Sequence, residues 1–274
     1  MFPFLVLAHS LQLTLPPAFG QAYVGETFSC TLCANNELFE GVERVITGVK
    51  IAAEMQTPSG TIPLELTPRD DDATKHQLEP EESLQKIVRF DLREEGNHVL
   101  AVSLSYSETT ISKDRSASSG RVRSFRKLYQ FAAQPCLGVR TKVSEFPSVD
   151  PKNAKGVSKR PARFALEAHL ENVADGSILL EKVTFITKAP FQSTSLNWDA
   201  SSQDGKRNVP PLLIPRDVMQ VAFLIEEQSQ HEVDLSPKEV RDGRTVLGQL
   251  SIQWRTAMGD LGFLTTGWLM TKKR

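Results

Sequence analysis

Apolar and polar residues alternate with a period of two along most of this chain, which is the pattern of half-buried antiparallel strands. Segment 24–32 alternates in this way near the start, as do segments 98–106 and 250–255 further on. No sustained helical period interrupts these segments. The hydrophobic pattern therefore predicts an all-β protein.

Short polar segments with turn-forming residues separate the predicted strands, for example at residues 57–60, 94–97, 175–176 and 258–262. Many short strands at regular spacing with turn signals are typical of β-sandwiches. A length of 274 residues fits two sandwiches of about 100 residues each plus loops. We expect two immunoglobulin-like antiparallel β-sandwich domains in tandem.

The best candidate for a linker is segment 146–161, which contains three prolines, a glycine and four basic residues. This composition is typical of a solvated connection. We therefore predict an N-terminal β-sandwich domain over residues 1–145, a linker over 146–161 and a second β-sandwich domain over 162–274. The two halves show no visible sequence repeat.

The three cysteines indicate a reduced protein. Cys30 and Cys33 have the spacing of a CxxC pair, but they lie within a predicted strand. There, the two Cα atoms are ~10 Å apart and the side chains point to opposite faces, whereas a disulfide tolerates at most about 7 Å. We expect Cys30 to be buried and Cys33 to face outward, as reduced thiols that fit the cytosol.

The net charge of −1 gives no global field that would attract nucleic acid or anionic lipid. No apolar run approaches the ~20 residues that a transmembrane helix needs. The apolar segment 1–8 resembles the core of a signal peptide but lacks a basic region before it. Apolar alternation resumes at Leu11, Leu13 and Leu15, so we expect an edge strand here, with a secretory signal as the alternative.

The sequence offers no recognisable catalytic, cofactor or metal site. The five histidines are scattered, and no His-Glu-x-x-His, Gly-x-Ser-x-Gly or phosphate-loop motif occurs. The acidic segment 69–82 lacks the glycine that a calcium loop requires. His98 begins an inward-facing row and is expected to be a satisfied histidine at a strand end. We predict a non-enzyme, although distant residues could still form a triad.

One strand is unusually basic and carries aromatic neighbours. Its candidate partner-binding residues are Arg121, Arg123, Arg126 and Lys127. Such a strand could meet an acidic partner or anionic lipid. The alternative is an edge strand that its charges protect from aggregation.

Several short segments occur together in the order found in one known family. They are residues 15–20, 25–29, 96–106, 125–127, 139–142, 166–168, 180–183 and 248–255. No single segment is specific, but the ordered set resembles subunit thirteen of the transport protein particle (TRAPP) complex. The resemblance spans roughly Leu13 to the C-terminus.

This resemblance implies a non-catalytic structural or adaptor subunit of a complex that tethers vesicles and activates a Rab-type GTPase. The implied setting is ER–Golgi traffic and autophagy, in the cytoplasm and peripheral to early Golgi and ER–Golgi membranes. The implied partners are other TRAPP subunits and, indirectly, the Rab-type GTPase; nucleic acid is not expected. Family members usually carry a further β domain, which is not recognisable in this sequence. The alternative is a secreted or cell-surface immunoglobulin-like binding module.

Overall fold

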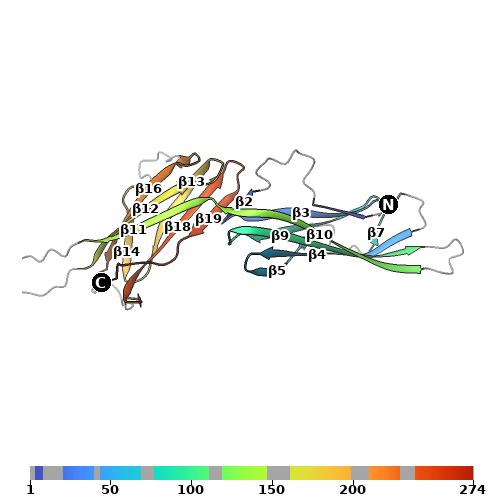
Figure 1. Ribbon diagram of the computed structural model, residues 1–274, viewed down its shortest axis with the longest axis horizontal. Coiled ribbons are helices and arrows are strands. Elements are labelled where there is room, and N and C mark those ends of the chain that lie inside the picture. Colours follow the sequence, from blue (N-terminus) through green and yellow to red (C-terminus); the bar gives the residue numbers. More distant parts are fainter. Residues whose placement is uncertain are drawn as a thin grey trace, which may run out of the picture. The chain divides into compact units, whose positions relative to one another are not determined.

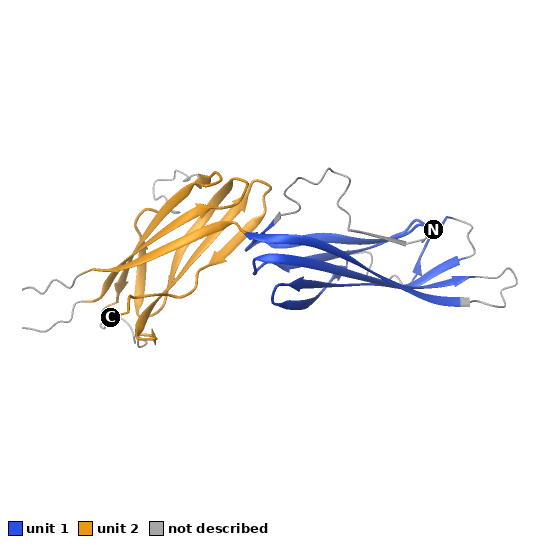
Figure 2. Ribbon diagram, in the orientation of Figure 1, with its two compact units in different colours: residues 1–134 blue, residues 135–274 orange. Residues whose placement is uncertain are grey.

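The computed structural model describes residues 4–8, 21–39, 44–68, 77–110, 119–146, 161–198, 210–228 and 238–273. Every regular element in these ranges is a β-strand, which confirms the all-β prediction (Figure 1). No helix within these ranges has the length and apolarity to cross a membrane. The chain divides into two compact units, Met1–Gln134 and Pro135–Arg274 (Figure 2).

Unit 1 contains two antiparallel sheets. Sheet A has the strand order β1 (Phe4–Ala8), β3 (Thr27–Asn36), β8 (Ser83–Asp91) and β6 (Thr67–Pro68). Sheet B has the order β2 (Gln21–Val24), β10 (Ser119–Pro135), β9 (Gly96–Thr110), β4 (Arg44–Thr57) and β5 (Gly60–Leu64), and β7 (Gln77–Leu78) also pairs with β4.

The two sheets of unit 1 pack face to face around one hydrophobic core. Sheet A contributes Leu32 and Val88, and sheet B contributes Met55 and Leu100, all fully or almost fully buried. Alternation produces this result, since every second side chain of a strand enters the core. Pro63 lies on β5, which ends sheet B, and an edge strand is where a proline is tolerated within a sheet.

Unit 2 also contains two antiparallel sheets. Sheet D has the order β11 (Leu137–Glu145), β12 (Arg163–Asn172), β16 (Val218–Glu227) and β14 (Phe191–Ser195). Sheet C has the order β15 (Leu212–Leu213), β13 (Ile178–Thr187), β18 (Arg244–Thr256) and β17 (Val240–Arg241), and β19 (Leu261–Thr265) and β20 (Leu269–Met270) also pair with β18.

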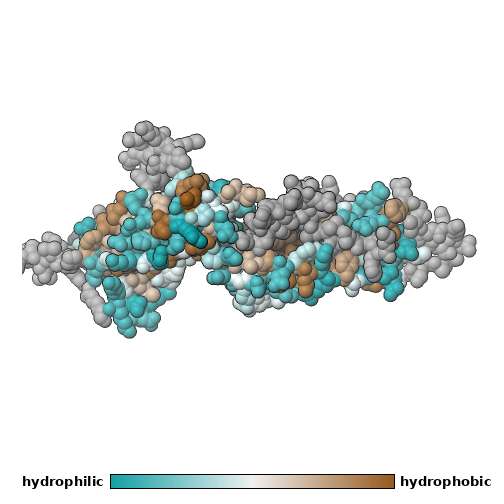
Figure 3. Space-filling model, turned by 45° about the horizontal axis from the view of Figure 1, so that its top comes forward, coloured by the Kyte–Doolittle hydropathy of each residue, from teal (hydrophilic) through white to brown (hydrophobic). Residues whose placement is uncertain are grey.

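The core of unit 2 is formed by every second side chain of its strands. These side chains include Phe164, Leu166, Ala168 and Leu170 on β12 and Leu250, Ile252 and Trp254 on β18, all buried. Phe185 on sheet C and Phe223 on sheet D bring their ring centroids within 6.1 Å, which joins the two layers. On the face drawn in Figure 3, hydrophobic residues form small patches among hydrophilic ones.

The two units repeat one strand plan, although the sequence shows no obvious repeat. In unit 1, β3 lies between β1 and β8, and β8 continues to β6; in unit 2, β12 lies between β11 and β16, and β16 continues to β14. The other two sheets correspond as well. In sheet B, β4 lies between β7 and β9, and in sheet C, β13 lies between β15 and β18.

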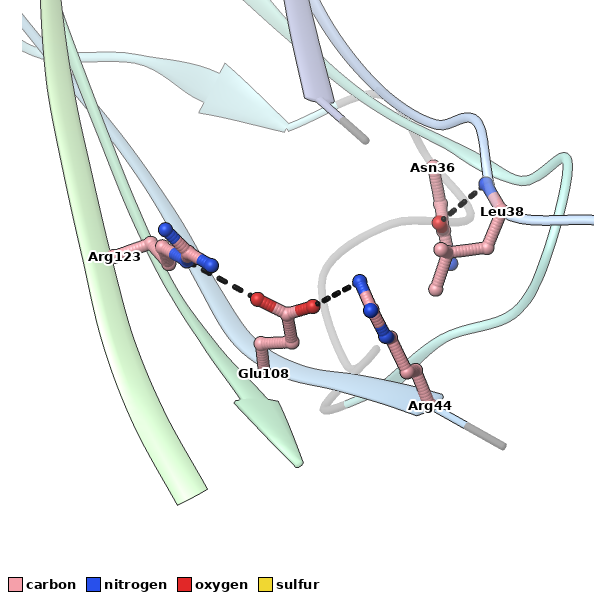
Figure 4. Close-up of polar contacts among 5 residues, drawn as sticks. All are labelled: Asn36, Leu38, Arg44, Glu108 and Arg123. Carbon is pink, nitrogen blue, oxygen red and sulfur yellow. Dashed lines mark hydrogen bonds and ion pairs between the residues drawn. The ribbon is translucent and has the colours of Figure 1, made fainter. Parts of the chain in front are cut away.

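A buried asparagine ends the corresponding strand in each unit. The Asn36 side chain accepts a hydrogen bond from the N–H of Leu38 at 3.1 Å (Figure 4) and donates to the carbonyl of Leu78 at 2.8 Å. Asn172 accepts from the N–H of Ala174 at 3.0 Å and donates to the carbonyl of Leu213 at 2.9 Å. Each asparagine therefore ties a strand end of one sheet to the opposite sheet.

The backbone around these two asparagines is also alike. The carbonyl of Asn36 accepts from the N–H of Glu81, and that of Asn172 accepts from the N–H of Arg216, both at 2.8 Å. Glu81 and Arg216 have positive φ angles of 65° and 72°, an unusual conformation for residues with a Cβ. The same strained turn thus precedes β8 and β16.

The boundary between the units lies before β11, whereas the sequence pattern placed it after residue 145. Strand β11 pairs with β12 from Leu137 opposite Asn172 to Glu145 opposite Phe164. Residues 137–145 therefore belong to a sheet of unit 2. Residues 147–160, most of the predicted linker, lie outside the described residues. In the sequence they come between β11 and β12, which pair in that sheet.

The cysteines are free, and Cys30 faces the core as expected, but the expected difference in burial between Cys30 and Cys33 is wrong. Cys30 packs against the core of unit 1 and is only partly buried, whereas Cys33 is 6% exposed. Since β3 lies between β1 and β8, even a residue on its outer face is flanked by strands on both sides. Alternation predicts the direction of a side chain but not what covers it.

Candidate partner-binding surface

The predicted basic strand is β10, which pairs with β9 from Ser119 opposite Thr110 to Ala133 opposite Gly96. Alternation divides its side chains between two faces. Arg121, Arg123 and Lys127 share the face of Phe125, Tyr129 and Phe131, which pack against the core. Arg126 lies on the outer face. The four predicted residues are therefore near one another in sequence but do not form one basic patch.

Arg123 forms an ion pair with Glu108 inside unit 1. Its Nε donates to Oε2 of Glu108 at 3.1 Å, and Nη1 of Arg44 donates to Oε1 of the same carboxylate at 2.9 Å (Figure 4). Glu108 is 7% exposed, and a buried carboxylate needs such partners to remain charged. Arg123 and Arg44 thus neutralise a charge between β4, β9 and β10.

The same carboxylate influences a neighbouring tyrosine. Burial raises the pKa of Tyr106, the Glu108 carboxylate raises it further, and Arg123 acts in the opposite direction. Tyr106 is buried and belongs to the core of unit 1. The polar cluster around Glu108 therefore borders the hydrophobic core, and its charge balance is part of the fold.

Arg126 forms an ion pair with Glu54 across an intervening strand. It stands opposite Ser103 on β9, and Glu54 stands opposite Ala101 on the same strand. These small side chains allow the arginine to reach over β9. The outer-facing Ala101 is almost fully buried, which is consistent with this cover.

Arg121 and Lys127 are the two of the four predicted residues that form no ion pair with another described residue. Both are exposed. The ammonium group of Lys127 lies 5.3 Å from the ring centroid of Tyr129, and Arg121 forms no ion pair with another described residue. These two cations are available to an acidic partner without breaking an internal pair.

The outer face of β10 offers a second kind of contact. Val122 and Leu128 are 75% and 59% exposed. The neighbouring outer positions of β9 are small, with Ser103, Ser105 and Ala101 opposite β10. The ion pair of Arg126 with Glu54 crosses these small residues of β9, so Val122 and Leu128 are two separate apolar contacts on either side of it.

The structure brings no other chemical group of interest together within the described ranges. Among the residues described there, no group of three or more His, Cys, Asp or Glu side chains could hold a metal ion. Burial raises the pKa of the Cys30 thiol to about 11, which makes it a poor nucleophile at neutral pH. His9, His76 and His231 lie outside the described residues.

Sequence reasoning missed Glu108, although it is the polar centre of this region. Its position on the inner row of a strand that continues the apolar series of Leu104 and Tyr106 was a usable signal, because a charge in such a row requires a partner. The identity of that partner was not readable, because Arg44 and Arg123 are distant in sequence.

The fold and this surface define a class of protein: an all-β scaffold of two sandwich units with exposed charged and apolar residues. Comparison with known families then identifies the group. Residues 6–133 match the family described as Trafficking protein particle complex subunit 13, N-terminal, and residues 137–273 match its middle domain. The chain belongs to the Trafficking protein particle complex subunit 13 family.

Individual relatives agree with this assignment. The chain is 26% identical over 259 residues to Trafficking protein particle complex subunit 13 of Xenopus tropicalis, covering 94% of this chain and 55% of the relative. It is 28% identical over 254 residues to the probable homolog of Caenorhabditis elegans, covering 93% and 54%. The chain thus spans about half the length of the curated relatives it matches.

Solved structures add little. The secreted serine protease VesC from Vibrio cholerae aligns with a TM-score of 0.25 at 8% identity, over 90% of this chain and 48% of the protease. Red sea bream transglutaminase aligns with a TM-score of 0.28 at 12% identity, over 97% and 31%. Scores this low support no conclusion about function.

Proposed function

We propose that this chain is a non-catalytic structural or adaptor subunit of a TRAPP-type complex that tethers vesicles and activates a Rab-type GTPase. The observation that carries the proposal is the match of two consecutive family domains, over residues 6–133 and 137–273. Together they cover nearly the whole chain in the family's order. This match favours a complex subunit over a secreted binding module.

The proposal extends to fold, place and partners. Each unit is an immunoglobulin-like sandwich, in keeping with the two-layered antiparallel sheets. The partners are other TRAPP subunits, and the Rab-type GTPase is reached indirectly. The protein acts in ER–Golgi traffic and autophagy, in the cytoplasm and peripheral to early Golgi membranes through its complex. The near-zero net charge supports protein partners rather than nucleic acid.

Within this role, the partner-binding surface is β10. Of the four residues expected there, Arg121 and Lys127 are free to meet an acidic partner, while Arg126 with Val122 and Leu128 forms the outer face. Arg123 contributes by holding Glu108 and so fixing the end of the strand. Long-range attraction to exposed cations speeds association, and exposed apolar side chains supply the affinity.

The test is affinity purification of the tagged chain from cells, followed by mass spectrometry. TRAPP subunits should co-purify with the unaltered chain, and recovery of a lone monomer would contradict the proposal. The double variant Arg121→Glu/Lys127→Glu should weaken binding about tenfold, or about 1.4 kcal/mol, and so lower the recovery of the partner subunits.

A matched control keeps this comparison interpretable. Lys142→Glu/Lys182→Glu makes the same change in net charge at exposed residues of unit 2 that form no ion pair with other described residues. It should leave recovery unchanged. If both double variants co-purify the complex equally well while remaining folded, β10 is not the binding surface.

A further inference from the structure

A pocket of about 290 Å³ opens in unit 1 between β5 and β8. Sheet B forms its floor with His98, Thr57 and Ile62, and sheet A contributes Phe90. The rim consists of Arg89, Asp91, Arg93 and Glu94. This volume is at the lower end of the range for ligand pockets, which suits one side chain better than a cofactor.

The pocket exists because sheet A does not cover Ile62 of sheet B. Ile62 stands opposite Met55 and therefore faces the core, yet Ile62 is 44% exposed while Met55 is fully buried. The chain leaves sheet B after Leu64 and joins sheet A as β6, which pairs only with Ile87 and Lys86 of β8. No described residue pairs with the outer edge of β8 beyond them.

The backbone of β8 presents unpaired groups along this edge. Leu92, next to β8, donates its N–H to Glu26 and accepts from Gly25, so its polar groups point toward β3. In an antiparallel ladder, alternate residues bond to opposite sides. The N–H and C=O groups of Arg89 and Asp91 therefore point to the open edge, which is a template for another strand.

His98 lines the pocket and carries a ring nitrogen that bonds to no described residue. His98 is fully buried, and its Nδ1 lies 3.0 Å from the carbonyl of Gly96. Because a carbonyl only accepts, Nδ1 carries a hydrogen, and in that tautomer Nε2 is an acceptor. Nε2 is buried and bonds to no described residue. Such an atom destabilises the fold until it receives a hydrogen bond.

The charged side chains at the rim differ in the hydrogen-bond and ion-pair partners that they have. Glu94 accepts from the hydroxyl and N–H of Ser59 at 2.5 and 3.1 Å, and Asp91 accepts from the hydroxyl of Thr27 at 2.9 Å. Arg93 lies 3.7 Å from Asp91, a loose pair. Arg89 forms no ion pair within the described ranges, so an acidic group beside the open edge would be favoured.

We propose that this edge of unit 1 binds an extended segment of a partner protein, which adds a strand to sheet A alongside Arg89–Asp91 and inserts a tyrosine into the pocket. The tyrosine ring covers Ile62 and Phe90, and its hydroxyl donates to Nε2 of His98. Strand addition with one side chain in a pocket is a known mode of peptide recognition. This site is separate from β10 and does not depend on its proposed role.

The test uses the full chain and a displayed library of extended peptides with a central tyrosine, followed by fluorescence anisotropy on the selected peptides. We expect binders that weaken about tenfold when Ile62 is changed to Lys, because a charge then enters the pocket. Thr61→Lys, on the opposite face of the same strand, should change Kd less than about twofold. Circular dichroism confirms that both variants fold.

Changes in the peptide test the two contacts separately. Replacing its tyrosine by phenylalanine should weaken binding about five- to tenfold, the value of one hydrogen bond to a buried acceptor. Methylating the backbone nitrogens beside the tyrosine should abolish binding, since these groups pair with β8. A library that yields no binder, or binders indifferent to Ile62→Lys or to methylation, would overturn the proposal. A phenylalanine peptide that binds equally well would remove His98 from it.

Discussion

Glu108 shows how one side chain can decide the role of its neighbours. It lies in a row of core residues, and Arg44 and Arg123 both bond to its carboxylate. Arg123, which the sequence places in a basic binding patch, therefore stabilises the fold by bonding to Glu108. The free cations Arg121 and Lys127 carry what remains of the patch.

Arg123→Met tests this distinction at the residue scale. The change keeps an unbranched apolar stem but removes the guanidinium group, which leaves one oxygen of the buried Glu108 without its partner. The free energy of unfolding should fall by about 1–2 kcal/mol in urea denaturation monitored by circular dichroism.

Arg121→Met is the matched control on the same face of the same strand. Because Arg121 is exposed and unpaired among the described residues, its loss should change stability by less than about 0.5 kcal/mol. Equal effects of the two variants would mean that the ion pair with Glu108 contributes nothing beyond a surface charge.

At the scale of elements, alternation predicted most strands and their inward rows because it reports which face of a strand avoids water. It predicted the rows of β12 and β18 correctly. It assigned β11 to the first domain, because the sheet that a strand joins depends on distant partners such as Leu137 and Asn172.

The candidate site was less predictable than the fold. The sequence identified β10 as basic, but the division of its side chains into paired and free cations depends on register with β4 and β9. The pocket lined by Ile62 could not be predicted from the sequence either. Pro63 indicated an edge strand, yet the exposure of a core-facing residue follows only from where the chain changes sheets.

Asn36 and Asn172 are asparagine clamps, since each joins a strand end of one sheet to the opposite sheet, and they lead to a prediction at this scale. Asn172→Ala removes three hydrogen bonds, to Gly176, Leu213 and Ala174, and leaves buried backbone groups unpaired. The free energy of unfolding of unit 2 should fall by about 2–3 kcal/mol in urea denaturation monitored by tryptophan fluorescence.

Asn197 is a control of the same residue type, which donates to the carbonyl of Gln220 and accepts from the N–H of Ala222, whereas Asn172 donates to two carbonyls. Asn197 is exposed, so water can replace its bonds, and Asn197→Ala should cost less than about 1 kcal/mol. A cost equal to that of Asn172→Ala would show that burial does not matter for these clamps.

At the scale of the whole molecule, each unit carries its own spectroscopic probe. The three tryptophans, at residues 198, 254 and 268, all lie in unit 2, and the three tyrosines, at residues 23, 106 and 129, all lie in unit 1. Tryptophan fluorescence therefore follows the unfolding of unit 2, while near-ultraviolet circular dichroism at the tyrosine bands includes unit 1.

Gly262→Ala uses this separation. A Cβ at Gly262 would lie 2.1 Å from Cε2 of the buried Trp254, so the β18–β19 pair must shift. The tryptophan transition in urea should lose about 1–3 kcal/mol, while the tyrosine signal of unit 1 keeps its midpoint. Gly267→Ala, where a Cβ meets no atom within 4 Å, is the control and should leave both transitions unchanged.

The repeated clamp of Asn36 and Asn172 also bears on ancestry. The same spacing separates Phe28 from Asn36 and Phe164 from Asn172, at equivalent places in the two strand plans. Duplication of one ancestral module would leave such a trace after most other identities had been erased. These positions supply fixed reference points for superposing the halves of any member of the family.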